Sequence, residues 1–229
     1  MKKIKCFLLD ILLFACIIGG LHFGYHVQRR IKDDNSLNRI YEEVRKEKQG
    51  KRIPWERLKK ENPDLVGWIF VKGTKIDYPV VQGKNNEEYL HQTFRKTYAY
   101  GGCIFMNSDC DMKSSQNLLI YGHHMRNGSM FADLMKFRSS TFAKKHSIYF
   151  YTPQKTYQLH AFSVYAQREE LSFPITFSKQ AEFQNYKEMM RKKSEVKLSR
   201  PADGKKMFTF VTCSYEGDNY RTYVHAAEP

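Results

Sequence analysis

The residues best suited to chemistry lie near the C-terminus, where Cys213 ends an apolar run and Arg221 follows eight residues later. Alternation over residues 208–213 predicts a strand that directs two phenylalanines to one face and the thiol to the other. Turn-forming residues 214–219 lead into a second β-rich run, and such a hairpin brings Arg221 back beside Cys213. A guanidinium beside a thiol favours the thiolate and can also hold a developing oxyanion. The pattern therefore indicates a nucleophilic cysteine, with a buried, unreactive cysteine as the alternative.

A candidate base for this thiol lies upstream, where the apolar run 117–121 is followed by Gly122, His123 and His124. A histidine at a strand end beside glycine is accessible to other loops and can exchange a proton near neutral pH. Two adjacent histidines can instead cap the strand or bind a metal, but no cluster of cysteine, histidine and aspartate with ligand spacing accompanies them in the sequence. We therefore predict no metal and no other cofactor. Cysteine, histidine and arginine together indicate nucleophilic catalysis.

These residues resemble the sortases of Gram-positive bacteria, and class B sortases most closely. Residues 209–213, Thr-Phe-Val-Thr-Cys, match the family's Thr-Leu-x-Thr-Cys pattern with phenylalanine in place of leucine. The tripeptide 121–123, Tyr-Gly-His, resembles the family's histidine strand end, and Arg221 in its β-rich run resembles the family's arginine. The similarity extends from about residue 36 to residue 225 and includes three further segments, 62–69, 76–83 and 85–90.

The resemblance implies a cysteine transpeptidase. Cys213 would attack the carbonyl carbon of a Thr-Gly or Thr-Asn type bond in the C-terminal sorting signal of a secreted protein and form a thioacyl enzyme. His123 would protonate the leaving amine, and Arg221 would position the substrate and stabilise the oxyanion. An amine of peptidoglycan, or of its lipid-linked precursor, would then release the protein in place of water. The same resemblance assigns substrate binding to Asn86, Leu90 and Thr212.

The N-terminal segment predicts a membrane anchor over residues 1–28. Residues 1–5 are basic, and residues 7–25 form a mostly apolar run that is about as long as a helix crossing a hydrocarbon core. No small-residue cleavage site follows, so we expect a retained signal-anchor and not a removed signal peptide. We therefore expect a single-pass protein of the cell membrane, with the membrane as a partner and an extracellular catalytic domain.

The remaining chain predicts helices followed by many short strands. An amphipathic helix over residues 36–48, with Ser36 as its N-cap and Gly50 after its end, and a short helix between Pro54 and Asn62 form a helical extension over residues 29–62. Short β-rich runs separated by Gly, Pro and Asn then indicate a sandwich or a barrel; they cover residues 67–71, 76–81, 102–106, 117–121, 147–152, 156–167, 207–213 and 220–226.

The resemblance implies the sortase β-barrel specifically. We therefore expect a mainly β fold of about eight strands with helical additions, in a catalytic domain over residues 63–229. Two helical segments interrupt the strands. One covers residues 130–135, and the other covers residues 178–193 and is inserted before the last two strands.

Charge and cysteine content leave some alternatives open. The formal net charge of +14 suits an anionic neighbour, but the sequence has no nucleic-acid motif, so we expect no nucleic-acid partner. Cys103 and Cys110 can pair and leave Cys213 free, or remain two unlinked thiols. Two other functions compete with transpeptidation: a membrane-tethered cysteine protease that ends in hydrolysis, and a non-catalytic wall-binding protein in which Cys213 is inert.

Overall fold

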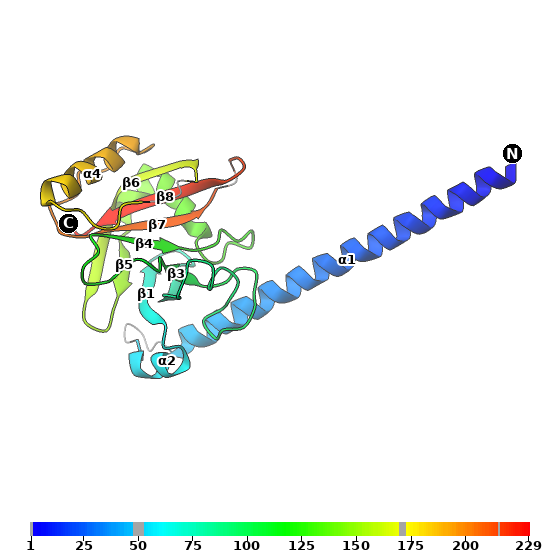
Figure 1. Ribbon diagram of the computed structural model, residues 1–229, viewed down its shortest axis with the longest axis horizontal. Helices are drawn as coiled ribbons and strands as arrows, with labels where there is room; N and C mark the ends of the chain where they lie inside the picture. The colour runs from blue at the N-terminus through cyan, green and yellow to red at the C-terminus, as the bar shows by residue number, and fades with distance from the viewer. Residues whose placement is uncertain (1, 48–52, 170–172, 215) are drawn as a thin grey trace.

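The computed structural model describes residues 2–47, 53–169, 173–214 and 216–229. Over these residues the chain forms a closed barrel of eight strands, with the order β1-β2-β3-β4-β7-β8-β6-β5 around its wall (Figure 1). Two neighbouring pairs, β2 with β3 and β4 with β7, are parallel, and the others are antiparallel. The strands are β1 (Leu65–Val71), β2 (Asp77–Val81), β3 (Ile104–Met106), β4 (Asn117–Tyr121), β5 (Ile148–Tyr151), β6 (Thr156–Arg168), β7 (Met207–Cys213) and β8 (Tyr220–Ala227).

The predicted strands and the mainly β fold are confirmed, and an aromatic interior explains why the alternation was informative. Phe208 and Phe210 share one face of β7, with ring centroids 6.2 Å apart. Phe208 also contacts Phe150 of β5, at 5.2 Å between centroids, although β5 is not a neighbour of β7 around the wall. This contact therefore crosses the barrel, and the phenylalanine face of β7 is the inward one. Large buried rings of this kind supply much of the hydrophobic stabilisation of a small core.

Helices cover the barrel from outside. The helix α4 (Gln180–Lys193) joins β6 to β7 and packs on β6, where Ser163 donates a hydrogen bond of 2.6 Å to the Met190 carbonyl. The predicted helix before the last two strands is thus confirmed. After β4 come the 3-10 helix η1 (Ala132–Arg138), close to the predicted segment 130–135, and the short helix α3 (Ser140–Lys145), which was not predicted.

The N-terminal helices differ in part from the prediction. The short helix α2 (Trp55–Glu61) forms as expected, but α1 (Lys2–Glu47) is one continuous helix, so Ser36 lies inside it and is not an N-cap. No proline interrupts this stretch, and the backbone hydrogen bonds can continue through it. The C-terminal end of α1 packs on the barrel, through side chains that include Tyr41, which donates a hydrogen bond of 2.8 Å to the Gly102 carbonyl. The rest of α1 extends away from the barrel (Figure 1), and Gly50 lies outside the described residues.

The predicted membrane anchor is wrong. Within the described part of the chain, no helix combines the length and the apolar character that a membrane crossing requires. The predicted single-pass localisation with an extracellular catalytic domain depended on this anchor, so that prediction is also wrong.

A buried histidine holds four neighbouring strands together. Thr209 of β7 donates its hydroxyl proton to Asn117 Oδ1 of β4 at 2.7 Å, so it can only accept from the Nδ1–H group of His225 of β8, at 2.9 Å. The hydroxyl of Tyr165 on β6 lies 3.1 Å from His225 Nε2 and donates to it. A neutral imidazole satisfies both neighbours. Burial, reinforced by Lys193 nearby, lowers the pKa of His225 to about 3.

This network predicts a specific loss of stability in acid. Because the folded-state pKa of His225 lies below the unfolded value of about 6.5, its contribution is fully present above pH 6.5 and is lost as the pH falls toward 3. We expect the free energy of urea unfolding to fall by about 1 kcal/mol per pH unit from this group alone below pH 6.5. His225→Gln should be less stable than wild type at pH 7 but should show a shallower decline between pH 7 and pH 5. Parallel declines in the two proteins would contradict this assignment.

Candidate active site

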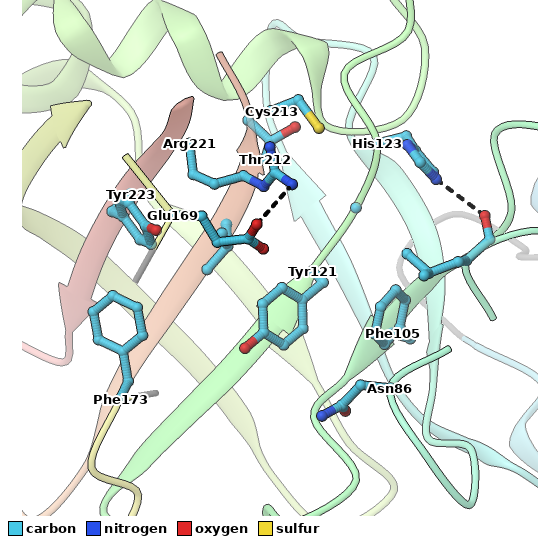
Figure 2. Close-up of a pocket in the computed structure, with 13 residues that line it drawn as sticks. Asn86, Phe105, Tyr121, His123, Glu169, Phe173, Thr212, Cys213, Arg221 and Tyr223 are labelled. Carbon is cyan, nitrogen blue, oxygen red and sulfur yellow. Dashed lines mark hydrogen bonds and ion pairs between the residues drawn. The ribbon is translucent and has the colours of Figure 1, made fainter. Parts of the chain in front are cut away.

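One cavity collects the residues that the sequence analysis selected. Its volume is about 320 Å³, and it lies where β4, β7 and β8 meet the loop after β2. The predicted residues Asn86, Leu90, His123, Thr212, Cys213 and Arg221 all line it (Figure 2). The structure therefore brings together six residues that are spread over more than half of the chain.

The hairpin of β7 and β8 places the thiol beside the guanidinium. Cys213 is the last residue of β7, and Arg221 is its direct partner across the antiparallel pair. The thiol of Cys213 is free and partly exposed. Arg221 donates from Nη1 to the Tyr220 carbonyl and from Nη2 to Glu169 Oε2, both at 3.3 Å. The predicted hairpin geometry is thus confirmed.

The position of His123 follows from the parallel pairing of β4 with β7. Tyr121 is paired with Val211, and the Gly122 amide extends the ladder by donating to the Val211 carbonyl at 3.2 Å. A Cβ atom on residue 122 would collide with Ile104 and with the ring of Phe131, so only glycine lets the strand end so close to its neighbours. Because parallel strands end at the same edge of a sheet, His123 and Cys213 emerge side by side.

The imidazole of His123 is held from several sides. Its Nε2 lies 3.0 Å from the Leu90 carbonyl, which can only accept, so Nε2 carries the proton and Nδ1 is the basic atom of the neutral ring. The rings of His91 and Tyr100 stack with it at 5.6 and 5.7 Å between centroids. Burial lowers the pKa of His123 below 6.5; the Leu90 carbonyl opposes this shift, and the neighbouring His91 and Arg221 add to it. The ring is therefore neutral at neutral pH.

The thiol and this imidazole face each other without a hydrogen bond in the described structure. Figure 2 shows the sulfur of Cys213 on the side of its strand that faces His123, whereas the Nε2 edge of the ring is turned toward Leu90. The second histidine, His124, has a different role, because its Nδ1 lies 3.1 Å from the backbone carbonyl of Cys213 and donates to it. His124 therefore contacts the backbone of the cysteine, whereas the sulfur lies on the side that faces His123.

Sequence reasoning missed several residues that line this cavity or pack against its histidine. Glu169, which pairs with Arg221, follows the end of β6, and its place could have been found only from the register of β6 against β8. His91 and Tyr100 come from a loop without periodicity, so no pattern indicated their stacking on His123. Aromatic side chains complete the wall: Phe105, Tyr121, Phe173 and Tyr223.

The other cysteines of the barrel do not compete for this role. Cys103 and Cys110 are both buried free thiols, so of the two alternatives the unlinked one holds. Burial raises the pKa of Cys103 to about 12 and that of Cys110 to about 11. Neither forms a thiolate readily near neutral pH, which leaves Cys213 as the exposed thiol of the cavity.

The chain is similar to known proteins over most of its length. Residues 69–229 match the sortase domain. The chain is 34% identical over 165 residues to sortase B of Listeria monocytogenes, which covers 70% of this chain and 67% of that protein. It is 31% identical over 225 residues to sortase B of Staphylococcus aureus, which covers 92% of this chain and 91% of that protein.

Solved structures of sortase B also match this chain. A Staphylococcus aureus sortase B–substrate complex matches with a TM-score of 0.75 and 29% identity, over 85% of this chain and 97% of that one. Sortase B from Bacillus anthracis in complex with AAEK1 matches with a TM-score of 0.77 and 29% identity, over 86% of this chain and 97% of that one. These matches agree in fold and cover most of the chain, and the chain belongs to the sortase family of cysteine transpeptidases, within it to class B.

Proposed function

We propose that this chain cleaves the C-terminal sorting signal of secreted proteins at a Thr-Gly or Thr-Asn type bond and transfers the protein to an amine of cell-wall peptidoglycan or its lipid-linked precursor. The observation that carries the proposal is the pairing of Cys213 with Arg221 in a cavity that His123 also lines. A substrate complex of the Staphylococcus aureus relative, which has the same fold, supports a substrate site in this protein.

In the first half-reaction the sulfur of Cys213 attacks the carbonyl carbon of the scissile bond. An unaided cysteine and histidine would form a thiolate–imidazolium pair only about 1% of the time. The low pKa of His123 favours a neutral ring instead, so Nδ1 takes the thiol proton as the carbon–sulfur bond forms. The carbonyl electrons move to oxygen, where Arg221 stabilises the negative charge. When the carbon–nitrogen bond breaks, His123 returns the proton to the leaving amine.

In the second half-reaction an amine replaces water as the nucleophile. The amine attacks the thioacyl carbon, His123 accepts its proton, and Cys213 leaves as the thiolate and is reprotonated. The enzyme then returns to its starting state, and the product contains a new amide bond. Transfer requires the amine to be oriented, because water is far more concentrated.

Three residues are proposed to hold the sorting signal. Asn86 accepts a hydrogen bond from the Ser108 amide at 2.8 Å, which fixes its side chain at the cavity wall and leaves its amide protons to a substrate carbonyl. Leu90 adds an apolar contact on the side of His123. Thr212 lines the cavity directly before Cys213, where it can contact the residues of the signal next to the scissile bond.

The proposed function is tested by determining whether an amine or water releases the thioacyl enzyme. The full chain should convert a fluorescent peptide that carries a Thr-Gly or Thr-Asn sorting signal into an amide-linked product when triglycine or a diaminopimelate-type amine is added, along with some hydrolysed acid. Mass spectrometry of the products separates the two, and Cys213→Ala should give neither. Hydrolysed acid alone with both amines would favour a cysteine protease over a transpeptidase.

The two adjacent histidines should differ sharply in effect. His123→Ala should lower kcat/KM for signal cleavage by roughly 10²–10⁴, because general acid and base are both lost. His124→Ala removes one hydrogen bond to the Cys213 carbonyl, so we expect a loss of roughly tenfold or less. Steady-state kinetics on the folded variants, checked by circular dichroism, gives both values. The reverse ranking would show that His124 is the proton-transfer group.

A further inference from the structure

The carboxylate of Glu169 is a charged group of the cavity that the proposed mechanism does not use. It lines the same cavity as Cys213 and lies 3.3 Å from Nη2 of Arg221 (Figure 2). We propose that Glu169 is a positioning residue that holds the Arg221 guanidinium and competes with the Cys213 thiolate for its charge, so that the resting thiol is less reactive than Arg221 alone would make it. This inference rests on the proposed role of Arg221, and its test does not require transpeptidation.

The sheet itself places Glu169 opposite Arg221. In the β6–β8 pair Gln167 is opposite Arg221 and Arg168 is opposite Tyr220. The Glu169 amide then donates to the Asn219 carbonyl at 2.7 Å, which extends the ladder by one residue beyond β6. Glu169 is therefore the diagonal neighbour of Arg221 on the adjacent strand, a spacing that long side chains can bridge. The contact follows from the register of the barrel and not from a chance encounter of two surface side chains.

The pair is held loosely enough to exchange partners. The side chain of Glu169 is 47% exposed and that of Arg221 is 25% exposed. An ion pair with that much solvent around it is weak, and the two hydrogen bonds of the guanidinium, to Tyr220 and Glu169, are long for charged hydrogen bonds at 3.3 Å. A negative charge that develops on the sulfur or on a substrate oxygen can therefore draw Arg221 away from Glu169.

Electrostatics gives the direction of the effect. A cation beside a cysteine stabilises the thiolate, and a carboxylate beside that cation cancels part of its field. Arg221 is charged at every working pH, so the charge of Glu169 decides how much of this field reaches the sulfur. Removing the negative charge while keeping the shape of the side chain should make the Cys213 thiol more reactive.

The test measures the reactivity of the thiol without any substrate. The full chain and its Glu169→Gln variant are treated with iodoacetamide at pH 7, and peptide mapping by mass spectrometry gives the alkylation rate of Cys213. We expect the variant to react about threefold faster, the factor that corresponds to one exposed ion pair. Glu188→Gln is the matched control, because Glu188 is paired with Arg191 on α4 and does not line the cavity, and its rate should equal that of wild type.

A double-mutant cycle separates this role from a general loosening of the structure. In an Arg221→Gln background, Glu169→Gln should no longer raise the alkylation rate, since the carboxylate then has no guanidinium to hold. An unchanged rate in the single variant, or the same increase with and without Arg221, would overturn the proposal. Either result leaves the transfer assay with peptide and amine unaffected as a separate test of the proposed function.

Discussion

The site depends on the parallel pairing of β4 with β7. This register sets Tyr121 against Val211, and both strands therefore end at one edge of the barrel, where His123 and Cys213 follow. The antiparallel β7–β8 pair adds Arg221 at the same level. A slip of one residue in either pair would turn the thiol to the other face of β7, away from the cavity. The buried chain of hydrogen bonds through His225 joins β4, β7, β8 and β6 and makes such a slip costly in free energy.

The electrostatic character of the cavity follows from that framework. Burial lowers the pKa of His123, and the Leu90 carbonyl fixes the tautomer that leaves Nδ1 free as a base. The cation of Arg221 is shared with Glu169 before any substrate arrives. The resting site thus combines a neutral base with a partly compensated positive charge. In such a site, proton transfer and nucleophilic attack occur together, and full charge develops only in the reaction.

Much of this arrangement could be predicted from the sequence. Alternating side chains between Gly, Pro and Asn indicated the strands, and the motifs shared with the sortases identified six of the 13 residues that line the cavity. The stacking of His91 and Tyr100 on His123 and the pairing of Glu169 with Arg221 could not be predicted, because each depends on contacts between segments distant in sequence. The continuity of α1 was missed because Ser36 resembles an N-cap. The anchor was expected from a basic start and an apolar run, whereas no helix of the described residues has the length and apolar character of a membrane span.

The central claim is that Cys213 forms a covalent bond with the acyl part of the substrate. It is tested most directly by incubating the full chain with a sorting-signal peptide in the absence of an amine, quenching in acid and mapping the protein by mass spectrometry. We predict an adduct on Cys213 with the mass of the peptide up to and including its threonine, which hydroxylamine removes because it is a thioester. An adduct on another residue, or turnover that persists in Cys213→Ala without any adduct, would contradict this account.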